Sequence, residues 1–308
     1  MDQLKDALEY ILTPSPAVFI VGGLIVLLVP ILVHIFVERA TPYAALPTIL
    51  LVGPAGGGKT SLQTLLERGG DGPAPATHTS QTPQPVELTV SRDGTSILPF
   101  RESARDDAPG SHKKFLLVDT PGHGKLRNHA MARIAGAIPK TSGNGKKESS
   151  GGGGAGPVRG IVFVGDAAAL DDGDGGLPAA AAYLYDVLMA LQRRAGAGRT
   201  SRAPSAIHVL VAANKLDLFT ALPASLVRSN LEAELGRIRQ SRSKGLLDSG
   251  VDVDDIGSEE QDAWLGQYGS DKFTFGQMRE FDIEVDVIGG SVLEGKVDKW
   301  WDWIAERV

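Results

Sequence analysis

Short apolar runs recur along the chain, and several of them end in glycine or in a small polar cluster. Such runs are typical of buried strands, because a strand that is covered on both faces carries few polar side chains. Stretches with helical spacing also occur, which together indicates an α/β fold with a mostly parallel sheet flanked by helices. Strands are predicted at residues 48–52, 86–90, 115–118, 160–165, 207–213 and 281–287, and helices at 59–68, 126–138 and 292–307.

The last predicted helix carries an apolar stripe along one side. Side chains that recur every three or four residues lie on one face of a helix. We expect this face to pack on the sheet, in preference to a membrane or a partner, because burial in the core is the usual role of such a stripe. Its members are Leu293, Val297, Trp300, Trp301, Ile304 and Val308, with Trp303 at its flank.

A glycine-rich loop follows the first predicted strand, where residues 53–60 read GPAGGGKT. Gly53 and Gly58 let the backbone curl so that consecutive N–H groups face a phosphate, and the start of the following helix adds partial positive charge. Lys59 would reach the β- and γ-phosphate oxygens, and the hydroxyl of Thr60 would hold Mg²⁺. The predicted nucleotide-binding residues of this loop are Gly53, Ala55, Gly56, Gly57, Gly58, Lys59, Thr60 and Ser61.

A second motif indicates which base is bound. The predicted strand at 207–213 runs into Asn214-Lys215-Leu216-Asp217, which has the form NKxD. The Asp217 carboxylate can accept hydrogen bonds from N1–H and from the exocyclic amino group of guanine, which adenine cannot offer in this way. The Asn214 side chain can bond the edge of the base and tie this loop to the phosphate loop. Asp217 is therefore predicted to select GTP over ATP, and the predicted nucleotide-binding residues of this motif are Asn214, Lys215 and Asp217.

A third motif lies between these two, where a predicted strand ends in Asp119-Thr120-Pro121-Gly122-His123. In this order of motifs, Asp119 is expected near Mg²⁺ and the N–H of Gly122 near the γ-phosphate. His123 follows at the position where GTPases place the residue that orients the attacking water, and a neutral imidazole can accept a hydrogen bond from water. A surface histidine without a catalytic role is the alternative for His123.

Two further contacts are predicted from weaker patterns. The first switch segment falls between the helix at 59–68 and the strand at 86–90, and there we favour Thr79 as the residue that contacts Mg²⁺ and the γ-phosphate. Ordinary loop polarity explains a threonine at this place almost as well. Gly290 and Ser291 follow the last predicted strand, where backbone amides could meet O6 of guanine.

The N-terminal part has a different character, since residues 17–36 form an uncharged apolar stretch of the length that spans a bilayer. A signal peptide would have a basic flank and a shorter apolar core, whereas Asp2, Asp6 and Glu9 make this flank acidic. A buried soluble helix would need a covering layer that so compact a domain lacks. We predict a short tail at 1–16, a membrane helix at 17–37, a linker at 38–47, and a cytosolic nucleotide-binding domain at 48–308.

Composition sets limits on the remaining possibilities. The 308 residues carry a net charge of −6 and include no cysteine. The negative charge argues against direct nucleic-acid binding, and the lack of cysteine excludes disulfides and prenylation. The Met1-Asp2 start does not fit myristoylation, so membrane attachment would rest on the apolar helix. Flexible loops are predicted at 91–111, 140–157 and 171–176, and a further surface loop at 241–257.

Together, the apolar span, the nucleotide motifs and the stretch DTPGHGKLR at residues 119–127 resemble the β subunit of the signal recognition particle receptor. Residues 77–80, Thr-His-Thr-Ser, contribute to the resemblance. It implies a P-loop GTPase of the Ras/Arf-like fold, held in the endoplasmic reticulum membrane by a single span, with a lumenal tail. It also implies that the GTP form recruits the N-terminal domain of the receptor α subunit, and so serves the ribosome and translocon indirectly in co-translational targeting.

The sequence leaves three interpretations open. The chain is either a switch that hydrolyses GTP on a stimulus, which His123 favours, or a constitutively GTP-loaded interaction module with negligible hydrolysis, which Ala55 favours. The Ala55 methyl group stands where many signalling GTPases have glycine, so we expect slow hydrolysis without a partner. A membrane-trafficking GTPase of the Arf or Sar kind is the third, but it would normally attach through a myristoyl group or an amphipathic helix.

Overall fold

The computed structural model describes residues 16–40, 46–69, 76–93, 96–103, 112–135, 155–171, 175–197, 206–248, 264–267, 269–270 and 272–308. The chain divides into two units, Met1–Ala45 and Leu46–Val308. The linker predicted at 38–47 therefore extends two residues too far, because the first strand already begins at Leu46. Residues 172–174 of the predicted acidic loop at 171–176 lie outside the described residues.

In the first unit, the helix α2 (Pro16–Ala40) covers the segment predicted at 17–37. Its side chains are described at Ile20 and at residues 22–33, where the large apolar ones are exposed. Within the described part of the chain, no helix is long and apolar enough to cross a membrane. Residues 1–15 of the predicted tail lie outside the described residues.

The second unit is built on a six-stranded sheet in the order β2-β5-β1-β6-β7-β8. The edge strand β2 pairs antiparallel with β5, and all other neighbours pair in parallel. The mostly parallel sheet expected from the sequence is thus confirmed. The strands are β1 (Leu46–Val52), β2 (Gln84–Val90), β5 (Lys113–Asp119), β6 (Ala155–Asp166), β7 (Ile207–Asn214) and β8 (Ile283–Gly289), with a separate hairpin of β3 (Arg92–Asp93) and β4 (Ser96–Ile97).

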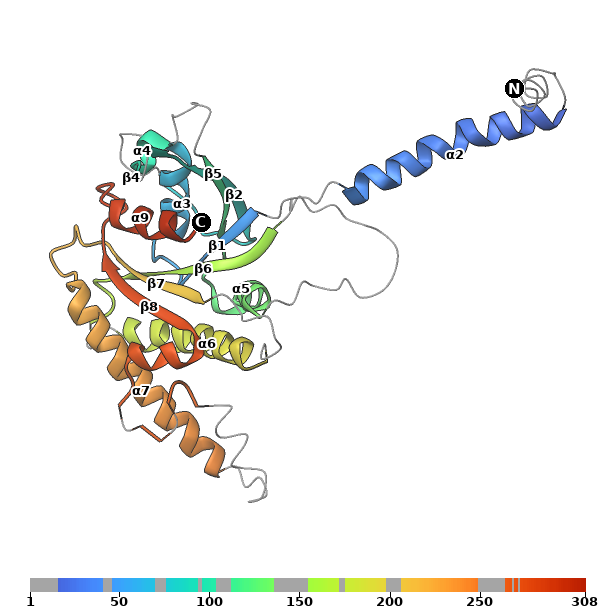
Figure 1. The fold of residues 1–308 in the computed structure, drawn as a ribbon. Helices are drawn as coiled ribbons and strands as arrows, with labels where there is room; N and C mark the ends of the chain where they lie inside the picture. Colours follow the sequence, from blue (N-terminus) through green and yellow to red (C-terminus); the bar gives the residue numbers. More distant parts are fainter. Residues whose placement is uncertain are drawn as a thin grey trace. The chain divides into compact units, whose positions relative to one another are not determined.

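Helices cover both faces of this sheet (Figure 1). In β1, Ile49 and Leu51 belong to one cluster of buried residues and Leu50 and Val52 to the other, because successive side chains of a strand point to opposite faces. One face is covered by α3 (Lys59–Arg68), α4 (Phe100–Ser103) and α9 (Asp298–Arg307), and the other by α5 (Asn128–Ile134), α6 (Gly176–Ala197) and α7 (Ala224–Asp248), with 3₁₀ turns at η1 (Gly124–Leu126) and η2 (Phe275–Phe281).

The prediction of a flexible loop at 91–111 is wrong for its first part. Ser91 is buried, and the β3–β4 hairpin and α4 follow it. Phe100 of α4 is also buried, with its ring centroid 6.4 Å from that of Trp301 on α9. This segment therefore closes the core at one edge of the sheet, and residues 104–111 lie outside the described part.

Two other predicted loops are shorter than expected. The helix α7 continues to Asp248, so the surface loop predicted at 241–257 is wrong for its first eight residues. Arg242 is exposed on this helix. The polar residues on the exposed side of a helix give a composition that a surface loop also has. The strand β6 begins at Ala155, inside the loop predicted at 140–157. The remainders of both loops lie outside the described residues.

The boundaries of two predicted helices are also corrected. The helix expected at 126–138 is described as η1 followed by the short α5, which ends at Ile134. The C-terminal helix begins at Asp298 and not at Val292, because a bridge between Ser291 and Lys296 turns the chain first. Leu293 consequently lies in this turn with 60% of its surface exposed, and its predicted place in the core is wrong.

Candidate nucleotide-binding site

All the predicted motifs lie in loops that leave one edge of the sheet. The strands β1, β5, β7 and β8 run parallel, so their carboxyl ends meet at that edge. The phosphate loop follows β1, the DxPG segment follows β5, the NKxD motif follows β7, and Gly290 follows β8. Loops at the carboxyl ends of parallel strands are the usual ligand-binding places of such folds.

The phosphate loop depends on its glycines for geometric reasons. Gly53 and Gly58 have φ angles of 138° and 97°, which side chains other than glycine rarely adopt. A Cβ atom at Gly53 would collide with the carbonyl oxygen of Val164, and one at Gly58 with the side-chain nitrogen of Asn214. The loop therefore lies in direct contact with β6 and with the NKxD motif.

Asn214 joins three loops of the site. It is 2% exposed, its Nδ2 donates to the carbonyl oxygen of Gly57 at 2.9 Å, and its Oδ1 accepts from the N–H of Val292 at 3.0 Å. The predicted tie between the NKxD motif and the phosphate loop is thus present in the fold. Its second bond reaches the loop after β8, which the sequence did not indicate.

The carboxylate of Asp217 is held by the loop after β8. Ser291 Oγ donates to Asp217 Oδ1 at 2.6 Å and accepts from the N–H of Glu294 at 3.2 Å. The N–H of Leu216 donates to the carbonyl oxygen of Gly290 at 3.2 Å. These bonds leave Asp217 Oδ2 for a further donor, so the fold orients a carboxylate of the kind that would recognise guanine.

Lys215 is held in an unusual backbone conformation beside this carboxylate. Its φ angle is 67°, which is uncommon for a residue other than glycine. Lys215 Nζ lies 2.6 Å from Oδ2 of Asp166 at the end of β6, and Asp166 Oδ1 accepts from the N–H of Ala168 at 3.1 Å. Asp166 is not among the residues predicted from the sequence, although a polar residue at the end of a buried strand on the same edge was a usable signal.

Lys59 and its neighbours form the part of the site that would face phosphate. The Lys59 ammonium is buried and donates to the carbonyl oxygens of Gly53 at 2.9 Å and Pro54 at 2.7 Å. Burial lowers the pKa of Lys59 to about 8; the Asp119 carboxylate opposes this shift, and the Arg127 charge adds to it. A phosphate at this place would supply the negative charge that the buried ammonium lacks.

Thr60 and Asp119 come together as the metal prediction requires. Thr60 Oγ1 donates to Asp119 Oδ2 at 2.6 Å, while Asp119 is fully buried and its Oδ1 has no hydrogen-bond partner among the described residues. Burial raises the pKa of Asp119, and hydrogen bonds from Thr60 and Ser80 and the Lys59 charge oppose this rise. Hydroxyl and carboxylate oxygens are the ligands that Mg²⁺ prefers, and a divalent ion would compensate the buried charge, so these residues fit Mg²⁺.

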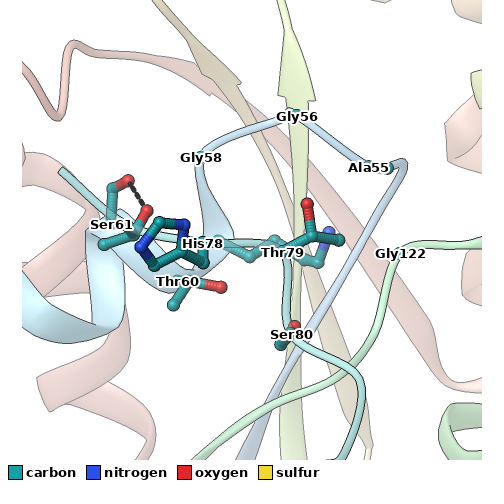
Figure 2. A pocket seen from close by; sticks show the side chains of 11 residues that line it. Ala55, Gly56, Gly58, Thr60, Ser61, His78, Thr79, Ser80 and Gly122 are labelled. Atoms are coloured by element: carbon teal, nitrogen blue, oxygen red, sulfur yellow. Dashed lines mark hydrogen bonds between the residues drawn. The ribbon is translucent and has the colours of Figure 1, made fainter.

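A pocket beside the phosphate loop contains the predicted switch residue Thr79 (Figure 2). Ser61 Oγ and Thr77 Oγ1 are 2.9 Å apart and share a hydrogen bond, which connects the first switch segment to α3. Thr79 is exposed, and Ser80, which the sequence analysis did not single out, also influences Asp119. The pocket is lined by Ala55, Gly56, Gly58, Lys59, Thr60, Ser61, Thr77, His78, Thr79, Ser80 and Gly122.

Gly122 and His123 differ in their relation to this pocket. Gly122 lines it so closely that a Cβ there would lie 2.5 Å from Lys59 Nζ and 2.6 Å from the N of Ala55. His123 is exposed and does not belong to the lining, and its Nδ1 accepts from the N–H of Lys125 at 3.3 Å. Gly122 therefore lies at the pocket beside Lys59, whereas His123, which was predicted to orient the attacking water, does not line it.

Comparison with known proteins identifies the family. The family model for the signal recognition particle receptor beta subunit matches residues 44–138 and 154–281. The chain belongs to this family. The family resemblance expected from the sequence is thereby confirmed, and the matched ranges contain the phosphate loop, the DxPG segment and the NKxD motif but not the loop after β8.

Individual relatives agree with the family assignment. Signal recognition particle receptor subunit beta of Saccharomyces cerevisiae is 27% identical over 264 residues, which cover 85% of this chain and 84% of that protein. A Chaetomium thermophilum structure, described as the receptor SRb-GTP/SRX complex, is 41% identical, covers 85% of this chain and 100% of that chain, and gives a TM-score of 0.68. Another from the same organism, described as SRb-GDP-Mg, is 41% identical, covers 87% and 100%, and gives 0.59.

Proposed function

We propose that this chain binds GTP with Mg²⁺ and that its GTP form recruits the receptor α subunit. The observation that carries the nucleotide assignment is the joining of three loops by Asn214 and of Asp217 to Ser291. The assignment is supported by the relatives described as SRb-GTP and SRb-GDP-Mg complexes. Thr60, Asp119 and Thr79 are the proposed Mg²⁺ residues, and the ion would neutralise phosphate charge there.

The residues of the chain suggest how nucleotide state would reach the surface. Lys59 and the loop N–H groups would hold the β-phosphate, while Thr79 and the N–H of Gly122 would contact the γ-phosphate, which GDP lacks. Thr79 is exposed, so an ordering contact there would change the surface offered to a partner. We propose that this surface binds the N-terminal domain of the α subunit, in line with the SRX component of the related complex.

The place of action in this proposal is the endoplasmic reticulum membrane, where residues 17–37 would form a single anchor and the nucleotide-binding unit would lie in the cytosol. The proposal is supported by the uncharged stretch at 17–36. The chain would then act on ribosome and translocon indirectly, through the α subunit, without direct nucleic-acid contact. Resistance of the full chain to alkaline extraction from microsomes would support the anchor, and release into the supernatant would contradict it.

A second candidate function is a GTP-loaded interaction module with negligible hydrolysis. The observation that favours it is the position of His123, which bonds the backbone of Lys125 and does not line the pocket. A cycling GTPase would need a partner to reposition this ring. The family match favours both candidates over a trafficking GTPase of the Arf or Sar kind.

One experiment tests both candidates. The full chain, purified in detergent with Mg²⁺, is denatured and the released nucleotide is identified by chromatography. Bound GTP would support the loaded module, and bound GDP a GTPase that hydrolyses unaided. Adenine nucleotide would contradict the guanine assignment.

A second experiment tests the recruitment of the α subunit. Retention of the α-subunit N-terminal domain on the immobilised chain should require GTP, and equal retention with GDP would contradict recruitment by the GTP form.

A further inference from the structure

Arg127 makes a contact that the nucleotide motifs do not explain. It stands between η1 and α5, and its guanidinium carbon lies 4.2 Å from the centre of the Tyr183 ring on α6. Tyr183 is fully buried, and its ring meets that of Phe163 on β6 at a T-shaped angle with centroids 5.9 Å apart. The arginine therefore stacks on a ring whose position is fixed by the core.

The ring is the main partner of this guanidinium. In the parts of the chain that the structure describes, no carboxylate pairs with Arg127, and its buried Nε has no hydrogen-bond partner. Arginine usually directs its planar set of N–H donors to carboxylates or phosphates. A cation over an aromatic face is attracted to it, more strongly when water is excluded. The stack is thus what holds this side chain in place.

Both partners of the stack are connected to the predicted γ-phosphate position. Arg127 follows Gly122 in the same segment, separated from it by His123 and η1. Tyr183 packs on β6, whose Val164 carbonyl oxygen lies so close to Gly57 that a Cβ there would be 2.6 Å from it. The helices α5 and α6 are also in contact. The stack therefore connects the segment after β5 to the elements that contact the phosphate loop.

We propose that Arg127 is a positioning residue, which acts with Tyr183 as a latch that holds Gly122 against the phosphate loop. The inference rests on the proposed binding of GTP. With the latch closed, the N–H of Gly122 is already held at the pocket, and a γ-phosphate would meet a preformed donor. GDP has no γ-phosphate, so the latch contributes to GTP affinity and not to GDP affinity.

The test compares nucleotide affinities of the full chain in detergent, measured with fluorescent GDP and a fluorescent non-hydrolysable GTP analogue. For Arg127→Met we expect about tenfold weaker binding of the GTP analogue and a change in GDP affinity of less than about twofold. Tyr183→Leu should reproduce this selective loss. Tyr183→Phe keeps the ring, and we expect it to restore the wild-type ratio of the two affinities.

Arg133→Met is the matched control, because it removes the same charge from α5, the helix that directly follows Arg127, without a stack on Tyr183. Equal affinity ratios in Arg127→Met and Arg133→Met would overturn the latch, and so would equal losses of both nucleotides in Arg127→Met. A wild-type chain that binds neither nucleotide would overturn the proposed function itself. Thermal unfolding followed by tryptophan fluorescence identifies a variant that fails to fold. If Arg127→Met or Tyr183→Leu fails to fold, the affinity ratio of the other variant tests the proposal.

Discussion

The base end and the γ-phosphate end of the proposed site differ in how far the protein itself prepares them. At the base end, Asn214 is buried with both functional groups bonded, and Asp217 is held by Ser291. At the γ-phosphate end, Thr79 is exposed, and the ring of His123 accepts a hydrogen bond from the backbone N–H of Lys125. The groups expected to recognise the base are therefore held in place by the fold, whereas at the γ-phosphate end only Gly122 is held against the phosphate loop, and the contacts of Thr79 and His123 are left to ligand and partner.

The largest expected effect tests the base end. Asp217→Asn replaces one acceptor of the carboxylate by a donor, which suits the carbonyl that xanthine carries in place of the amino group of guanine. We expect GTP affinity to fall on the order of a thousandfold and xanthosine triphosphate to bind in its place, because a site built for hydrogen bonds rejects a mismatched partner strongly. Competition binding with both nucleotides measures the exchange.

Ser291→Ala is the control for this change, since it leaves the carboxylate in place and removes only the bond that orients it. We expect a loss of GTP affinity of about tenfold without a gain for the xanthine nucleotide. If Asp217→Asn and Ser291→Ala lost GTP equally and neither bound xanthosine triphosphate, Asp217 would not be the group that reads the base.

The second-largest expected effect is a loss of stability at the base end. Asn214→Ala would leave the carbonyl of Gly57 and the N–H of Val292 buried without a partner. At about 1 to 3 kcal/mol for each such group, we expect the free energy of unfolding to fall by roughly 3 kcal/mol. All four tryptophans of the chain lie between residues 264 and 303, so their fluorescence reports the unfolding of this unit within the full chain.

Asn230→Ala provides the comparison for Asn214→Ala, because among the described residues Asn230 makes a single side-chain bond, which it donates to the carbonyl oxygen of Leu170 at 3.2 Å. We expect it to cost about 1 kcal/mol. Equal destabilisation by the two changes would show that the base end is not held more firmly than an ordinary surface helix.

The γ-phosphate end is tested by Ala55→Gly. The N of Ala55 lies against Gly122, and the Ala55 side chain lines the pocket. If its methyl group displaces the attacking water, removing it should raise single-turnover hydrolysis by up to about a hundredfold. GTP affinity should change by less than about threefold, since the loop N–H groups stay in place. An unchanged rate would show that the Ala55 methyl group does not limit hydrolysis.

The two ends also differ in how much of them could be predicted from the sequence. The motifs at the ends of β1, β5 and β7 were found because a buried strand and a following polar cluster are both local patterns. The tie from Asn214 to the phosphate loop could be anticipated from its side chain alone. The position of the His123 ring could not, because it depends on the conformation of a short turn that the motif does not specify.

A contact between distant segments and a tight turn account for two of the errors in the predicted fold. The segment around Phe100 looked like a loop because its few apolar residues show no period, yet Trp301 packs on Phe100 and its Nε1 donates to the carbonyl of Leu98 at 2.9 Å. Leu293 fits a helical stripe, but Gly295 at a φ of 69° turns the chain before the helix begins. At Phe100 a tertiary contact overrode the local pattern, and at Leu293 a tight turn did so.

The smallest expected effect is a dependence of phosphate binding on pH. In the nucleotide-free chain the pKa of Lys59 is about 8, mainly because of burial, and a bound phosphate should return it toward its ordinary value of 10.5. Binding above pH 8 must therefore include uptake of a proton. We expect the affinity for GDP to fall about tenfold between pH 7 and pH 9.

The same pKa fixes the sign of the effect on stability. Between pH 8 and 10.5 the unfolded chain keeps the Lys59 proton that the folded nucleotide-free chain has lost, so the free energy of unfolding should rise with pH in this range. Lys59→Arg is the control for the measurement of GDP affinity. Arginine keeps its charge between pH 7 and pH 9, and titration of the guanine ring affects the wild type and the variant equally. If the GDP affinities of the wild type and of Lys59→Arg changed with pH in the same way, Lys59 would keep its proton in the empty site. The phosphate end would then be more polar than its burial indicates.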